Sequence, residues 1–298
     1  MGEMRRISQP GPAPHERIES AVGRLQVLDF TLEPGLTLNA AITGPLMAAG
    51  MGAAQVEVSG GGFGPFTYVM PAAASDAIHA AWYSAPFTPA GETRLDRGNV
   101  TFGHKEGAPF IHCHAFWTEP DGSRHGGHIM PHETVVAAPI RARAYGAAEV
   151  ETTADFDSET NFPLFTPHLS PHLSPHARSV PAEGGPRIAF ARVRPNVEIG
   201  AAVEELCRRY GFAGGRLRGG VGSLIGARFT DAQPVDDYAT EVFVTSGTVA
   251  ADASGALTAQ IDLALVSFTG AMAEGRLVRG ANPVLITFEL AVEEIPTA

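Results

Sequence analysis

The stretch Phe110-Ile111-His112-Cys113-His114-Ala115-Phe116-Trp117 is the most informative part of this chain of 298 residues. Its aromatic and β-branched residues alternate with smaller ones, which favours an extended strand. Side chains two positions apart on a strand point to the same face, so His112 and His114 are predicted to lie side by side. Two imidazoles presented in this way can bind one divalent metal ion.

The chain is predicted to reverse direction directly after this strand. Glu119-Pro120-Asp121-Gly122 is typical of a turn, and Gly126-Gly127-His128 follows on the returning segment. A returning strand brings His128 back beside the first two histidines. Three histidines that leave a fourth position open are the geometry of a catalytic zinc site rather than a closed structural one. The sequence therefore predicts that His112, His114 and His128 bind Zn²⁺ or another divalent transition metal.

Other residues close to the three histidines have different expected roles. His125 and His132 flank the site, and each remains an alternative ligand or a support for His128. Cys113 alternates away from the two strand histidines, so we expect it in the hydrophobic core.

Composition restricts the partners of the chain. The formal net charge is −11, with 32 acidic against 21 basic residues, which disfavours nucleic acid. The short basic pieces Arg216-Leu217-Arg218 and Arg141-Ala142-Arg143 alternate like strand residues and are interpreted as solvated strand faces. A small anionic molecule remains an acceptable partner, because a bound metal dominates the local charge.

The cellular location is inferred from segments that the sequence lacks. No apolar run approaches the roughly 20 residues that span a bilayer, so no membrane association is predicted. No apolar segment follows the arginines at positions 5 and 6, which argues against a secretory signal. With only two cysteines, the chain is expected to be a reduced, cytoplasmic protein.

The two halves of the chain correspond to each other without gaps around the predicted site. In this alignment the second half carries Gln260, Asp262 and Arg276 at the positions of His112, His114 and His128. Arginine cannot ligate a cation, so the second half is expected to lack the metal. We predict a metal-binding domain over residues 1–160 and a degenerate copy over residues 187–298.

The segment between the predicted halves, residues 161–186, contains Pro-His pairs at every fourth position. Regularly spaced prolines forbid a helix and do not suit a central strand, so an extended linker is expected. A histidine-rich metal scavenger is the alternative.

Each half also has a predicted helix followed by a glycine-rich segment. The helices are expected near residues 38–49 and from Ile199 to Tyr210, the second with Asn196 as N-cap and Gly211 as its stop. The glycines of 59–64 and 219–223 do not fit a phosphate-binding loop, and we interpret them as turns or bulges.

The His-x-His motif, the turn ending at Gly122 and the Gly-Gly-His motif resemble the PPC domain, also written PCC, of plants and prokaryotes. The resemblance covers residues 17–144 in full and 187–294 more weakly. It implies an α+β fold, in two tandem copies of a mainly antiparallel sheet with a few packed helices. It also implies assembly as a homo-oligomer, commonly a trimer. The same resemblance implies that His112, His114 and His128 are zinc ligands.

Acetolactate decarboxylase shares the fold implied by this resemblance, and it too is duplicated and binds zinc. Chemistry of that kind needs an arginine and carboxylates near the metal. The candidates for these catalytic roles are Glu57, Arg97 and Glu159. No cofactor other than the metal is expected.

The function predicted from the sequence is a zinc-binding, PPC-like lyase or hydrolase that acts on a small organic acid. The alternatives are a non-catalytic module that oligomerises or associates with DNA in regulation, and a sensor whose assembly responds to metal. The plant relatives carry AT-hooks, whereas this chain has no Arg-Gly-Arg-Pro sequence and an acidic balance.

Overall fold

Strands dominate the architecture of the chain. The computed structural model describes residues 4–171 and 185–295. Strand accounts for 56% of the residues and helix for 8%, and the described residues contain two helices, α1 (Leu38–Ala48) and α2 (Ile199–Tyr210). The expected α+β class is therefore wrong, and the fold is mainly β. The helices predicted near residues 38–49 and from Ile199 to Tyr210 are confirmed, but more than half of the residues pair as strands.

The larger sheet is built from residues of the first half and has the order β2-β12-β3-β8-β9-β10-β5, with four strands at its margins. Its members are β2 (Gln26–Leu32), β3 (Ala53–Ser59), β4 (Gly62–Phe63), β5 (Tyr68–Val69), β8 (Thr93–Lys105), β9 (Ala108–Thr118), β10 (Arg124–Ile129), β11 (Val136–Ala138), β12 (Ile140–Ala147), β13 (Val150–Phe156) and β14 (Pro163–Leu169). A separate pair is formed by β6 (Pro71–Ala72) and β7 (Trp82–Tyr83).

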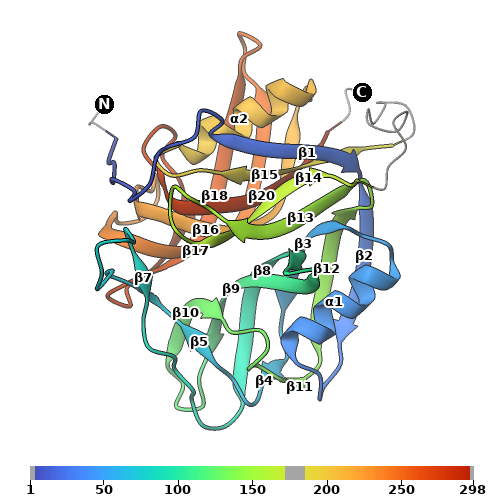
Figure 1. Cartoon of the computed structure of the whole chain (residues 1–298), viewed down its shortest axis with the longest axis vertical. Helices are drawn as coiled ribbons and strands as arrows, with labels where there is room; N and C mark the ends of the chain where they lie inside the picture. The colour runs from blue at the N-terminus through green and yellow to red at the C-terminus, as the bar shows by residue number, and fades with distance from the viewer. Residues whose placement is uncertain (1–3, 172–184, 296–298) are drawn as a thin grey trace.

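The second sheet has the order β1-β15-β20-β16-β17-β18-β19. Its members are β1 (Ile18–Arg24), β15 (Arg187–Val193), β16 (Gly215–Ala227), β17 (Val235–Ala251), β18 (Leu257–Ser267), β19 (Met272–Arg276) and β20 (Val284–Glu294). Beyond β1, this order follows the same pattern as β2-β12-β3-β8-β9-β10 in the larger sheet. Figure 1 shows the two sheets stacked along the long axis, with β1 from the start of the chain crossing over to the second one.

The ends of helix α2 agree with the sequence at one terminus and differ at the other. Gly211 takes the left-handed conformation with φ 65°, as expected for a residue that stops a helix. The N-cap, however, is Glu198, whose carboxylate accepts a hydrogen bond from the backbone N–H of Ala201. Asn196 instead bonds the backbone of Ile7 through its side-chain amide. Neither helix of the described residues is long and apolar enough to cross a membrane.

The segment predicted as a linker contributes a strand where the structure describes it. Residues 163–169 form β14, which pairs with β13 alone and therefore lies at an edge. An edge strand tolerates Pro163 and Pro167, because a missing N–H on the open side breaks no ladder bond. The later Pro-His pairs begin at Pro171, and their other residues lie outside the described residues. The domain boundaries at 160 and 187 stay a prediction.

Apolar side chains join the two sheets. Phe116 of the larger sheet packs edge-on against Phe243 of the second, with ring centroids 5.2 Å apart, and Val221 is buried in the same cluster. The glycine-rich segment of β16 allows a further close approach. Gly219 has φ 99° where the register shifts, and the N–H of Gly220 donates to Asn99 Oδ1 across the halves. The predicted bulge at residues 219–223 is therefore confirmed.

A buried network of ion pairs also fastens the halves together. Asp157, in the turn between β13 and β14, forms ion pairs with Arg192 at 2.8 Å and with Arg194 at 2.7 Å. Burial alone would raise the pKa of Asp157, but the two guanidinium groups outweigh it and lower the pKa to about 2. Both arginines belong to the second half, so this carboxylate links the first half to strand β15 and the residue after it.

We predict that Asp157→Asn lowers the free energy of unfolding by about 2–4 kcal/mol, because it leaves two buried guanidinium groups short of a partner. The folded-state pKa lies below the ordinary value of 3.8, so the stabilisation is complete above about pH 4. It is lost as the pH falls toward about 2. Urea unfolding of both proteins across this range tests the prediction.

The matched control is Asp155→Asn, which changes an exposed carboxylate two residues earlier, on strand β13. Its stability should stay close to that of the wild type at every pH. A difference between the wild type and Asp157→Asn that does not shrink in acid would contradict the assignment.

Candidate metal centre

The predicted strand, turn and returning strand are confirmed by β9 and β10. The backbone N–H of Gly122 donates to the Glu119 carbonyl and closes the turn. The antiparallel register then places His128 directly opposite His114. Directly opposed residues on neighbouring strands have adjacent side chains, so the local sequence is sufficient to bring these two imidazoles together.

His112, His114 and His128 lie together in the structure. One ring nitrogen from each lies within 4.8 Å of the other two, and the ring centroids are 4.5–5.3 Å apart. His114 is almost fully buried. His125 and His132 are outside this cluster: His125 bonds Ser123, and His132 is exposed.

The partners of the Nδ1 atoms determine where the protons of two rings lie. His114 Nδ1 is 2.9 Å from the Val242 carbonyl oxygen, and His112 Nδ1 is 2.9 Å from Glu289 Oε2. A carbonyl and a carboxylate accept hydrogen bonds, so each Nδ1 carries the proton and each Nε2 presents a lone pair in the neutral ring. The two Nε2 atoms nevertheless face each other at 2.9 Å. Two lone pairs at this distance repel unless a proton or a metal ion lies between them.

A carboxylate from the second half also lies beside these Nε2 atoms. Glu241 Oε2 lies 2.8 Å from His114 Nε2, and its side chain is 10% exposed. Within the described residues, the buried Nδ1 of His128 has no hydrogen-bond partner. Three imidazoles and one carboxylate are a common donor set for zinc and related divalent metals, so the residues present fit such an ion. Glu289 and the Val242 carbonyl would orient two of the ligands.

Burial lowers the pKa of both His128 and His112, but the charged neighbours of these two rings act in opposite directions. Burial, together with the positive charge that His112 and His114 can carry, lowers the pKa of His128 well below 6.5. Burial also lowers the pKa of His112, but the Glu289 carboxylate outweighs it and the net shift is upward. The Tyr83 hydroxyl is buried near Glu241 and Glu289, and all three effects raise its pKa.

Sequence reasoning missed the contribution of the second half to this centre. Glu241 and Val242 lie on β17 and Glu289 on β20, more than a hundred residues from the histidines. No spacing rule connects these positions to the His-x-His motif. These contacts arise only because β17 packs across β9 in the folded chain.

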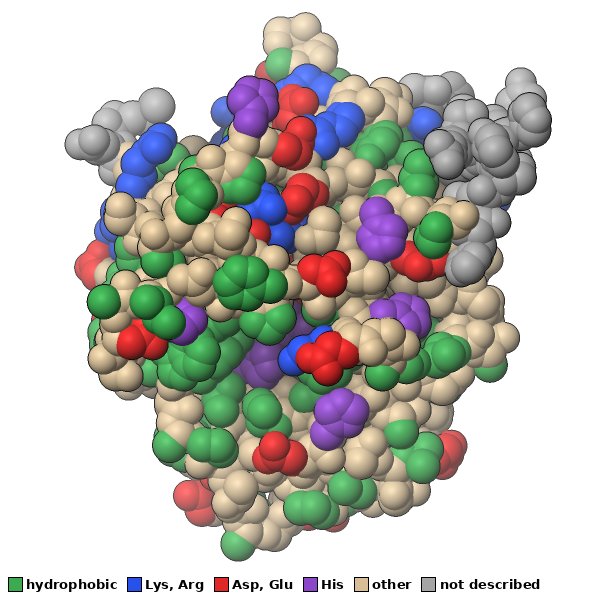
Figure 2. All heavy atoms as spheres, viewed as in Figure 1, with side chains coloured by type: hydrophobic (Ala, Val, Ile, Leu, Met, Phe, Trp, Pro, Cys, Tyr) green, Lys and Arg blue, Asp and Glu red, His purple; other side chains and the backbone are tan. Residues whose placement is uncertain are grey.

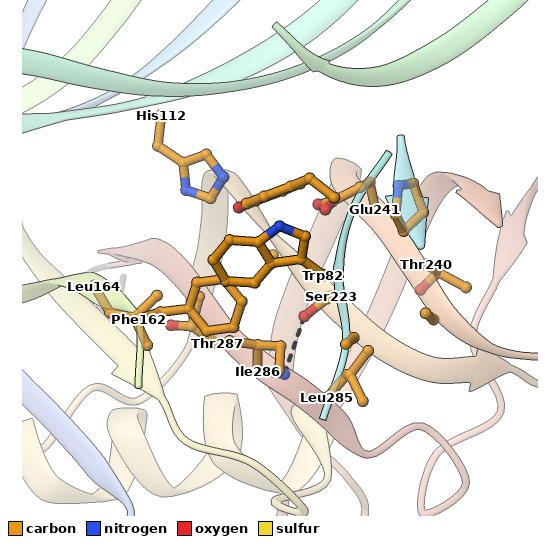
Figure 3. Close-up of a pocket in the computed structure, with 15 residues that line it drawn as sticks. Trp82, His112, Phe162, Leu164, Ser223, Thr240, Glu241, Leu285, Ile286 and Thr287 are labelled. Atoms are coloured by element: carbon orange, nitrogen blue, oxygen red, sulfur yellow. Dashed lines mark hydrogen bonds between the residues drawn. The ribbon is translucent and has the colours of Figure 1, made fainter. Parts of the chain in front are cut away.

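A small cavity of about 50 Å³ opens beside the cluster. His112 and Glu241 line it together with aromatic side chains, and Figure 3 shows Trp82 and Phe162 beside Leu285 and Ile286. Thr287 also lines this cavity. Its Oγ1 is buried and has no hydrogen-bond partner within the described residues. Figure 2 shows several histidine side chains spread singly over one face of the molecule.

The three catalytic candidates lie elsewhere. Glu159 is 2% exposed and forms ion pairs with Arg17 and Arg194, so it belongs to the network that fastens the halves. Glu57 and Arg97 line another cavity, between the larger sheet and β17. None of these three residues lines the cavity beside His112.

No family model and no curated protein matches the chain. Among solved structures, a plant- and prokaryote-conserved (PPC) protein from Pyrococcus horikoshii aligns with 49% of this chain and 94% of its own, at 15% identity and a TM-score of 0.37. A metal-containing protein from Archaeoglobus fulgidus aligns with 50% of this chain and 98% of its own, at 19% identity and a TM-score of 0.37. These structural neighbours are thus similar to about half of the chain.

We predict that the purified chain binds about one zinc ion and that His128→Ala loses it. Glu289→Ala should weaken zinc binding by about 10–100-fold, because it removes the acceptor that orients His112. Competition with a chromophoric chelator measures the affinity, and mass spectrometry measures the metal content.

His125→Ala is the matched control, because this histidine lies on the same strand as His128 but outside the cluster. It should keep the wild-type zinc content. Equal zinc loss in both alanine variants, or none in His128→Ala, would contradict the assigned ligands.

Proposed function

We propose that the chain is a zinc-dependent, PPC-like lyase or hydrolase that acts on a small organic acid. The observation that supports this proposal most is the meeting of two imidazole lone pairs and one carboxylate oxygen at 2.8–2.9 Å. Holding these atoms together in a largely buried place is costly unless a cation compensates.

We further propose that the chain is a tandem duplication in which one copy kept the metal. The two sheets have the same order of corresponding strands, and this supports the inference. So does the register, since Asp262 lies opposite Arg276 as His114 lies opposite His128. The second copy has exchanged its ligands for an ion pair, while its strands β17 and β20 supply Glu241 and Glu289 to the first.

A divalent metal, when bound, would supply Lewis-acid polarisation of a substrate oxygen. The residues around the cavity would do the rest. Glu241 would hold the metal together with the three histidines, and the Tyr83 hydroxyl and Thr287 Oγ1 are hydrogen-bond donors among the lining residues. Trp82 and Phe162 would exclude water, which strengthens each of these interactions.

The dimensions and lining of the cavity support a small substrate. A volume of about 50 Å³ beside His112 accommodates only a few non-hydrogen atoms. Short 2-hydroxy and 2-keto acids combine an oxygen pair for the metal with a small apolar remainder for the aromatic wall. These compounds are the first substrates to test.

We predict that the zinc-loaded protein cleaves a member of this series and that His128→Ala has no measurable turnover. Thr287→Val, which removes a hydroxyl at nearly constant volume, should lower kcat/KM about tenfold. Thr258→Val on strand β18, away from the cavity, is the control and should behave like the wild type. Stoichiometric zinc without turnover of any acid in the series would contradict the enzyme proposal.

A non-catalytic module is the second candidate, and one observation favours it. The three histidines come from the first half and Glu241 from the second, so a metal bound among them would clamp the two sheets together. In this case zinc would raise the thermal midpoint strongly while no substrate is turned over. Calorimetry with and without a chelator, beside the activity screen, separates the two functions.

A further inference from the structure

A larger cavity lies at the positions of the second half that correspond to the metal ligands. It has a volume of about 270 Å³, and its lining includes Gln260, Asp262 and Arg276. These are the residues that align with His112, His114 and His128. The second half therefore keeps a cavity at the positions that hold the three histidines in the first half, but different polar side chains line it.

Arg276 is held in position at this cavity by its neighbours. Its Nε and Nη2 each lie 3.1 Å from the Asp262 carboxylate, which also accepts a hydrogen bond from Ser246 Oγ at 2.7 Å. The Arg276 side chain is still 48% exposed. The remaining N–H groups of the guanidinium are thus available to a ligand, in an orientation fixed by the ion pair.

Two more arginines line the same cavity, from strand β16. The guanidinium of Arg218 bonds Glu293 and lies 4.6 Å from the Tyr145 ring centroid, which fixes its position. Arg216 is exposed, and its side chain has no hydrogen bond or ion pair within the described residues. Its five N–H donors are therefore free, and the fork that they form matches a carboxylate or phosphate.

The charge of the lining residues favours an anion, against the overall charge of −11. Three arginines line the cavity with two acids, Glu57 and Asp262. Asp262 pairs with Arg276, and Glu293 pairs with Arg218, so Arg216 carries the positive charge that has no ion-pair partner within the described residues. Thr245 and Thr248 add hydroxyl groups to the lining. Glu57 has no ion pair within the described residues, and its negative charge would oppose an anionic ligand.

We propose that this cavity, which we call the arginine cavity, binds a small oxyanion between Arg216, Arg218 and Arg276. Phosphate and carboxylate groups share the chemistry that these guanidinium groups recognise. The inference is independent of the proposed catalytic function, because none of these residues lines the cavity beside His112.

The test is isothermal titration of the full chain with inorganic phosphate and, in a second arm, with succinate. The protein is first treated with a chelator, so that neither anion can bind through a metal, and the ionic strength is held constant with sodium chloride. Binding of phosphate alone would identify a phosphate site, and binding of succinate alone a carboxylate site. Either result supports the proposal.

The variants give the sharper result. Arg216→Gln removes an exposed, unpaired side chain, so the protein should stay folded while anion affinity falls about tenfold. Glu57→Gln should instead raise the affinity about threefold by removing a like charge. Arg141→Gln, at another exposed strand arginine outside the arginine cavity, is the matched control and should leave the affinity unchanged.

Three results would overturn the proposal. One is the absence of binding for both anions, and another is equal weakening by Arg216→Gln and Arg141→Gln, which would reflect overall charge. The third is weaker binding in Glu57→Gln. Zinc content should be unchanged in Arg216→Gln, so a failure here leaves the metal proposal standing.

Discussion

The antiparallel register between β9 and β10 is the constraint on which the rest of the centre depends. It places His114 opposite His128 and His112 two residues away on the same face. Because side chains alternate with a period of two, a shift of one residue would turn both strand histidines into the core and expose Cys113 and Ala115 in their place. The tight turn at Glu119–Gly122 sets the register, and the apolar face carrying Ile111 and Cys113, both buried, opposes a shift.

The second sheet gives this local arrangement its chemical character. On an isolated hairpin the histidines would be solvated, and each neutral ring would exchange between its two tautomers. Packing β17 and β20 across them buries the rings and supplies two Nδ1 acceptors, the Val242 carbonyl and Glu289. The lone pairs of His112 and His114 are thereby directed at one point, next to Glu241. Desolvation then makes the interaction with a cation stronger than it would be at the surface.

The opposed positions of the two hairpins carry different groups. In the first half the opposed positions carry His114 and His128, and in the second they carry Asp262 and Arg276, which neutralise each other directly. An ion pair needs no metal to satisfy it, so the second sheet can be complete without an ion. The first half depends on the second for two carboxylates, and the buried network around Asp157 keeps the two in contact.

The sequence by itself determined the local features of this protein. The alternation around His112, the turn at Gly122, the helix that ends at Gly211 and the bulge after Leu217 all follow from residues close together in the chain. Their period, turn chemistry and backbone conformations are properties of short segments. The α+β expectation failed because it was implied by a family resemblance rather than by the segments themselves, and most of those segments pair as strands.

Only the tertiary structure decided which distant residues meet. Glu241 and Glu289 approach the histidines, Glu159 is drawn into an ion-pair network, and Glu57 comes to face Arg216 and Arg218 across the arginine cavity. A contact between strands of two sheets depends on how those sheets pack, and no short-range period encodes that packing. The three histidines could therefore be proposed as metal ligands from their positions in one hairpin. The carboxylates that contact them, Glu241 and Glu289, could not be found in this way.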